Sequence, residues 1–162
     1  MKKLVFSPIL FVLFTIFPSI TFGQILTIDE NFTPQQLVQN ILVNNPCAGT
    51  ANISATGHAF QNGNSFAYFN AGNSNFPFAE GIVLSTGRAA SVVGPNDRLL
   101  SEGPPTWAGD PDLEDALQIG QSSVNATIIE FDFMPLSSKF SFEYIFASEQ
   151  YLVSASPNQC NY

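Results

Sequence analysis

Two neighbouring runs late in the sequence, Ala126–Met134 and Lys139–Ala147, constrain the fold more than any other feature. Each alternates apolar or aromatic residues with polar ones, and the four residues Pro135–Ser138 join them. Alternation with a period of two is typical of a half-buried β-strand, and a short connection between two such runs is typical of a hairpin. The sequence therefore predicts an antiparallel hairpin whose aromatic face, which includes Phe131 and Phe142, lies in the core.

The polar face of this hairpin carries acids that meet in the register set by the connecting loop. Glu130 is expected opposite Glu143 with Asp132 nearby, an arrangement that is destabilising unless water screens the charges or a cation bridges them. One interpretation is a Ca²⁺ site formed by these three carboxylates. Asp110 and Asp112, which precede the hairpin, would add oxygen ligands. The alternative is a solvated sheet face, with Asp110 as the N-cap of a short helix.

The remaining elements indicate a β-rich domain with one early helix. A capping-box pattern followed by an apolar face predicts an amphipathic helix over Thr33–Val43. Three short runs between turn residues predict strands, namely Asn52–Thr56, Ser65–Phe69 and Gly81–Ser85. The 16 Phe beside only 11% charged residues also favour this class. We expect an all-β fold, a two-sheet antiparallel β-sandwich with a short N-terminal amphipathic helix.

Trp107, the one Trp of the sequence, lies in a Pro- and Gly-rich loop between Gly94 and Gly109. A loop of this length is typical of a binding loop or of a cover over a sheet. Trp stacks on sugar rings while neighbouring polar groups bind sugar hydroxyls. Trp107 is therefore a candidate ligand-binding residue, and the alternative is that it plugs the open end of the sandwich.

The N-terminal residues indicate export. Lys2 and Lys3 precede a short apolar run interrupted by Pro, and small residues follow before Gln24, which predicts a signal peptide over residues 1–23. Residues 24–162 then form one domain of a secreted or cell-surface protein. No second long apolar run follows, so no transmembrane segment is expected after signal removal.

Cys47 and Cys160 are the two cysteines of the sequence. In an oxidising compartment such a pair predicts a disulfide, which for a long loop contributes roughly 4 to 5 kcal/mol in the chain-entropy picture. The alternatives are two unpaired thiols or a partner cysteine beyond Tyr162.

Charge and motifs argue against several classes of function. The formal net charge of −8 disfavours nucleic acid or an anionic membrane as partner. No nucleophile elbow, zinc-binding His motif or phosphate-binding loop occurs, and His58, the only His, is interpreted as a turn residue. Glu130 and Glu143 resemble a glycosidase carboxylate pair only in type, because no cleft is indicated beside them.

Four motifs carry a family resemblance. They are NFTPQQLVQNILV (Asn31–Val43), FPFAEGIVLSTG (Phe76–Gly87), GDPDLEDAL (Gly109–Leu117) and IIEFDFMPLSSKFSFEYIFASEQY (Ile128–Tyr151). In this order they resemble choice-of-anchor L domains, secreted domains frequent in Bacteroidota. The resemblance implies an exported β-rich surface module and a client of type IX secretion. It also implies a domain that continues beyond Tyr162, because family members extend into further strands.

These observations predict a non-catalytic exported module that acts in adhesion or matrix contact, with surface glycans or matrix proteins as partners. The first alternative is a glycan-binding module, assisted by Ca²⁺, that uses Trp107 and the acids. The second alternative is a secreted hydrolase.

Overall fold

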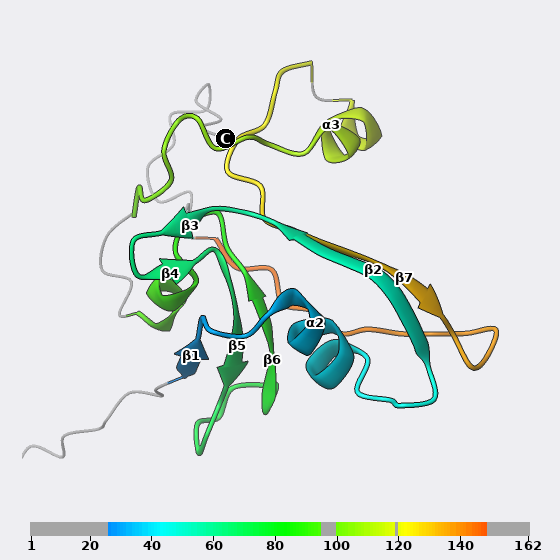
Figure 1. Cartoon of the computed structure of the whole chain (residues 1–162). Helices are drawn as coiled ribbons and strands as arrows, with labels where there is room; N and C mark the ends of the chain where they lie inside the picture. The colour runs from blue at the N-terminus through cyan, green and yellow to red at the C-terminus, as the bar shows by residue number, and fades with distance from the viewer. Residues whose placement is uncertain (1–25, 95–99, 119, 149–162) are drawn as a thin grey trace, which may run out of the picture.

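The computed structural model describes residues 26–94, 100–118 and 120–148 of the 162-residue chain (Figure 1). Within these residues, seven strands form three small antiparallel sheets, and the helices are short. The β-rich class is thus confirmed, while the two-sheet sandwich stays a prediction. The predicted signal peptide, Cys160 and Tyr151 lie outside the described residues.

The first sheet has the strand order β1-β5-β6 and consists of β1 (Thr27–Asp29), β5 (Phe66–Asn70) and β6 (Glu80–Leu84). Alternate residues of the middle strand, Ala67 and Phe69, are buried. Phe69 also packs edge-on against Phe76 from the connection to β6, with ring centroids 5.5 Å apart. The predicted strand near Ser65–Phe69 is therefore the centre of this sheet, and its period-two pattern forms the core face.

The second sheet pairs β2 (Gly49–Thr56) with β7 (Ile128–Met134), which run side by side as the longest strands in Figure 1. Their register shifts between Ala51 and Ser54. Asn52, inside this irregularity, has a φ of 51°, a left-handed conformation that Asn tolerates better than most residues. The third sheet is a hairpin of two strands, β3 (Ala59–Phe60) and β4 (Gly63–Asn64), each two residues long.

The early helix lies between the first two sheets. It begins as α2 (Pro34–Gln36) and continues as the π-helix η1 (Leu37–Leu42). The capping box forms: the Gln36 N–H donates to the Thr33 hydroxyl at 3.2 Å, and the Thr33 N–H donates to the Gln36 side chain at 2.9 Å. Leu37 and Val38 are fully buried. Because α2 contacts β2 while η1 contacts β5 and β6, the helix joins the two sheets (Figure 1).

Two further helices lie outside the sheets. η2 (Ala89–Val93) follows β6, and α3 (Pro111–Leu117) stands apart from the sheets in Figure 1. Asp110 caps α3 as expected, since its carboxylate accepts from the Asp112 and Leu113 N–H groups at 3.0 and 3.2 Å.

The predicted C-terminal hairpin is wrong for the described residues. β7 forms and pairs with β2, which places Glu130 opposite Ser54, and residues 139–147 form no strand beside it. Residues 135–148 turn back beyond the end of β7 and contain no strand (Figure 1). Alternation predicts which face of a strand is buried, but a partner that is distant in sequence leaves no local signal.

Candidate functional site

The acids predicted as a cation site lie in separate parts of the molecule. Glu130 and Asp132 are exposed on β7, and the Asp132 carboxylate accepts a hydrogen bond from the Asn52 amide across the β2–β7 pair. Glu143 lies in the segment after β7, whereas Asp110 caps α3. The strand that was expected to bring Glu143 opposite Glu130 does not form.

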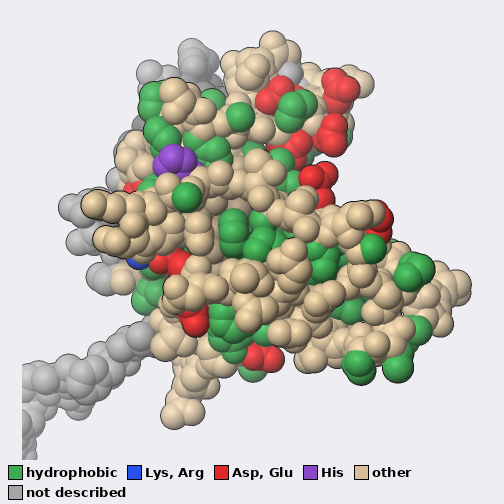
Figure 2. Space-filling view, in the orientation of Figure 1, with side chains coloured by type: hydrophobic (Ala, Val, Ile, Leu, Met, Phe, Trp, Pro, Cys, Tyr) green, Lys and Arg blue, Asp and Glu red, His purple; other side chains and the backbone are tan. Residues whose placement is uncertain are grey.

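Asp112 is exposed in the first turn of α3, where Asp and Glu side chains gather at the surface (Figure 2). Within the described part of the chain, no three His, Cys, Asp or Glu side chains form a group that could hold a metal ion. Acids in a first helical turn are accounted for by capping and by the helix dipole. Ca²⁺ binding stays a prediction from the sequence.

Trp107 is buried, with 6% of its surface exposed. Its Nε1–H donates to the Ala126 carbonyl at 2.8 Å. One face of the indole stacks on His58 with centroids 5.3 Å apart, and Phe60 meets it edge-on at 6.3 Å. This arrangement agrees with the packing interpretation of Trp107, because a ring covered in this way offers no free face to a sugar. It also gives His58 a place in an aromatic cluster.

Glu30 is the most highly coordinated carboxylate among the described residues. It accepts from Arg88 Nη2 at 2.7 Å and from Arg88 Nε at 3.2 Å to each oxygen. The N–H groups of Asn64 and Ala90 donate to it at 3.2 and 3.3 Å. Burial acts to raise the pKa of Glu30, but these hydrogen bonds and the Arg88 charge together hold that pKa below its ordinary value. The hydrogen bonds of Glu30 link the end of β1 to β4 and to η2.

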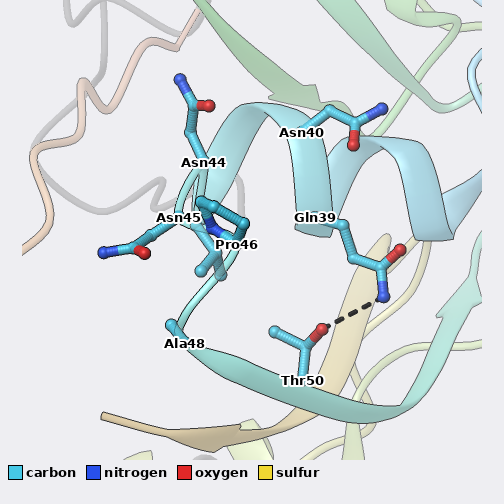
Figure 3. Close-up of a pocket in the computed structure, with 8 residues that line it drawn as sticks. Gln39, Asn40, Asn44, Asn45, Pro46, Ala48 and Thr50 are labelled. Atoms are coloured by element: carbon cyan, nitrogen blue, oxygen red, sulfur yellow. Dashed lines mark hydrogen bonds between the residues drawn. The ribbon is translucent and has the colours of Figure 1, made fainter. Parts of the chain in front are cut away.

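A hollow of about 520 Å³ opens between the end of η1 and the start of β2 (Figure 3). Most of its lining is amide or hydroxyl side chains, from Gln39, Asn40, Asn44, Asn45 and Thr50. The other lining residues are small and apolar, and none of the lining residues is charged. In a chain with a net charge of −8, this hollow is a neutral surface that offers both donors and acceptors.

Hydrogen bonds fix the backbone around this hollow. The Gln39 amide donates to the Thr50 hydroxyl at 3.2 Å and closes one side, as the dashed line in Figure 3 shows. The Asn45 side chain accepts from the Cys47 N–H at 3.0 Å, which forms the turn after η1. The amides of Asn40 and Asn44, which belong to the lining, have no hydrogen-bond partner within the described residues.

Cys47 is exposed beside this hollow, and the structure records no disulfide at it. Its predicted partner, Cys160, lies outside the described residues. The disulfide therefore stays a prediction.

One comparison with known proteins gives a match, to the model of a protein family. A family of this class indicates a surface or secreted module. The chain belongs to the choice-of-anchor L domain family, whose model matches residues 26–162. This is not a known enzyme family. No curated protein and no solved structure matches the chain. None of the helices among the described residues has the length and apolar character needed to cross a membrane.

Two features of the site had little or no signal in the sequence. Six Asn and Gln residues between Gln35 and Asn45 could have pointed to an amide-rich surface, but polar residues at a helix end are ordinarily solvated. The coordination of Glu30 by Arg88 had no sequence signal, because the two residues lie in different elements and meet only in the folded chain.

Proposed function

We propose that this chain is a non-catalytic adhesion module that is presented on a cell surface or secreted. The observation that carries the proposal is the family match over residues 26–162, because a choice-of-anchor domain indicates a surface or secreted module. The acidic composition agrees with an exported and soluble surface. His58 packs against Trp107 and Phe60, which agrees with a role in packing.

Adhesion is tested with beads that carry the purified protein on surfaces coated with matrix proteins, mucin or mixed glycans. The expected result is retention under flow that exceeds retention of beads carrying heat-unfolded protein. Equal retention of folded and unfolded protein on every surface would refute the proposal.

A second candidate function is glycan binding, and the amide-lined hollow favours it. Its volume of about 520 Å³ lies within the range of small-ligand sites, roughly 300 to 1,000 Å³. Uncharged amides hydrogen-bond to sugar hydroxyls as both donors and acceptors, and the small apolar residues suit the C–H faces of a sugar ring. Trp107 is not part of this candidate, because its ring is buried away from the hollow lining.

A glycan array with two variants tests this candidate. Asn40→Ala and Asn44→Gly remove two of the lining amides, and Gly suits position 44 because Asn44 has a φ of 41°. Each lost hydrogen bond is expected to weaken binding about fivefold. Asn73→Ala, an exposed loop amide outside the hollow, is the matched control. An array that stays blank, or signals equal in all three variants, would exclude the hollow as a glycan site.

Ca²⁺ assistance is a separate part of the glycan candidate and has its own experiment. Calorimetric titration with Ca²⁺, combined with thermal melting in EDTA, is expected to show heat of binding and a higher melting temperature with the ion. Glu130→Gln with Asp132→Asn is expected to remove both effects. No heat and no change in melting would remove Ca²⁺ from the proposal.

A further inference from the structure

Asn62 and Gly63 form the one Asn-Gly pair of the sequence, and they lie at the turn of the hairpin β3–β4. Because Phe60 pairs with Gly63, Gln61 and Asn62 are the two loop residues, and Asn62 is exposed. Each strand of this hairpin is two residues long. A hairpin of this length has little stability of its own, so contacts with neighbouring elements hold it closed. Figure 1 shows the hairpin close to η2, which contacts β4.

Lack of space requires glycine at position 63. The Gly63 Cα lies against the ion pair of Glu30 and Arg88, and a Cβ attached to it would collide with the Glu30 carboxylate and with Arg88 Nε. Both side chains of the pair are held in position. Two main-chain N–H groups donate to Glu30, and Arg88 Nη2 donates to the Asn62 carbonyl at 2.6 Å. The packing of the ion pair therefore keeps glycine directly after an exposed Asn.

Glycine after Asn favours a reaction within the main chain. Gly63 has no side chain that hinders its nitrogen, so this nitrogen can reach the side-chain carbon Cγ of Asn62. A bond forms between the Gly63 nitrogen and Cγ, the Cγ–Nδ2 bond breaks, and ammonia leaves with the proton of the Gly63 nitrogen. The product is a succinimide ring. Water opens this ring at either of its carbonyls, which yields aspartate or isoaspartate, and the reaction needs no oxidant or reductant.

We propose that Asn62 is a site of spontaneous deamidation through a succinimide, and that the contacts of Glu30 and Arg88 slow the reaction in the folded protein. In the closed hairpin Gly63 is paired with Phe60, and Arg88 holds the Asn62 carbonyl. The Gly63 nitrogen reaches Cγ when the hairpin opens, so the rate of deamidation follows the population of the open hairpin. The ion pair therefore sets how fast this turn is modified.

Isoaspartate formation changes the group that Arg88 contacts. In the structure this group is the main-chain carbonyl of Asn62. After ring opening to isoaspartate, the same carbon belongs to a free carboxylate, and the main chain continues through Cγ with one additional methylene. The new carboxylate competes with Glu30 for the Arg88 guanidinium. The longer loop also displaces Gly63 from its register with Phe60, so the modified hairpin is weaker than the original one.

Peptide mapping by mass spectrometry measures the reaction in folded protein at mildly alkaline pH, where the attacking nitrogen loses its proton more readily. Methylation by an isoaspartyl methyltransferase identifies isoaspartate among the products. We expect conversion at Asn62 to be slowest in wild type, faster in Glu30→Gln and fastest in protein unfolded by urea. Glu30→Gln is expected to accelerate conversion about tenfold, because it weakens the hydrogen bonds that hold the hairpin closed. Arg88→Lys keeps the charge but loses the paired contact with Glu30, and is a second variant with the same expectation.

Asn73, an exposed residue of the loop between β5 and β6, is the internal control in the same digest. It lies outside the hairpin, so its conversion should be equal in wild type and in Glu30→Gln. Circular dichroism checks that each variant is folded. The absence of conversion at Asn62 in the folded variants, over a period in which the unfolded protein converts, would overturn the proposed site. Equal rates at Asn62 in wild type and both variants, or an equal acceleration at Asn73, would overturn the role of the ion pair.

Thermal melting tests the consequence of the modification. Asn62→Gln places the side-chain carbonyl one methylene further from the Gly63 nitrogen, so ring closure is slower, and the exposed position tolerates the change. Wild type that carries isoaspartate at position 62 is expected to melt at a lower temperature than fresh wild type. Asn62→Gln should melt at the same temperature before and after the same incubation. Equal melting of fresh and modified wild type, or a matching loss in Asn62→Gln, would overturn the predicted weakening of the hairpin.

Discussion

Replacement of Glu30 by Gln is the sharpest test of how the first sheet is held to its neighbours. Gln keeps the size of the side chain and one oxygen acceptor, but it loses the charge and the paired contact with Arg88. Only 11% of the Glu30 side chain is exposed, while 37% of the Arg88 side chain is exposed. The attraction between the two charges is therefore partly screened by water, and the hydrogen bonds carry most of the expected effect.

The magnitude follows from the contacts. Hydrogen bonds to a charged group contribute about 1.5 to 3 kcal/mol, and Gln retains part of them, so we expect Glu30→Gln to lower the free energy of unfolding by about 1 to 2 kcal/mol. Glu30→Ala leaves the Asn64 and Ala90 N–H groups without their acceptor and is expected to cost about 2 to 3 kcal/mol. For a domain of this size, each kcal/mol lowers the melting temperature by about 3 to 4 °C.

The effect of Glu30 depends on pH with a defined sign. The folded protein holds the pKa of Glu30 below its ordinary value of 4.5, so folding favours the ionised carboxylate. Its contribution is fully present above pH 4.5 and is lost as the pH falls below this value through the folded-state pKa. Urea unfolding from neutral to acidic pH should show wild type and Glu30→Gln differing most at neutral pH and converging in acid.

Glu130→Gln is the matched control, because Glu130 is an exposed carboxylate on β7. This variant is expected to unfold within about 0.5 kcal/mol of wild type. Equal stability of Glu30→Gln and wild type at neutral pH, or a difference between them that does not change with pH, would refute the assigned role of Glu30.

Three further changes test other parts of the fold. Trp107→Ala is expected to cost about 3 to 5 kcal/mol in urea unfolding because the ring is buried, whereas Trp107→Phe should cost about 1 kcal/mol through loss of the Ala126 hydrogen bond; equal losses would contradict this. Thr33→Ala removes the cap of α2 and is expected to cost about 1 kcal/mol by the same measurement, and an unchanged midpoint would exclude the capping role. The hydrogen bond to Glu80 raises the pKa of Tyr68 above 10.0, so stability present below pH 10.0 should be lost as the pH rises through the folded-state pKa, and Tyr68→Phe should remove that alkaline loss. An identical alkaline profile in the variant would count against this bond.

Local patterns in the sequence predicted the elements better than their partners. The capping box at Thr33, the N-cap at Asp110 and the alternation near β5 and β7 all depend on residues a few positions apart, and each appears in the structure. The pairing of β7 with β2 joins segments far apart in the chain. No short-range signal specifies such a pairing, because many strands have compatible faces.

In the candidate site, too, the residue types did not predict where the side chains lie in the folded chain. Trp107 was considered as a ligand-binding residue from its type and its loop, but its burial depends on His58 and Phe60, which come from another part of the chain. The amide-lined hollow arises where the end of η1 approaches the start of β2. Its shape follows from helix packing, which the Asn and Gln residues alone do not indicate.

The segment Lys139–Ala147 shows how a local pattern can lead to a wrong tertiary assignment. The alternation from Phe140 to Phe146 indicates a strand with one face to be covered, and nothing in that alternation requires the cover to come from β7 of the same chain. In the structure β7 pairs with β2, and the four aromatic rings of this segment are exposed on the described chain. The alternation therefore specifies that one face of the segment is apolar, and it does not specify what covers that face.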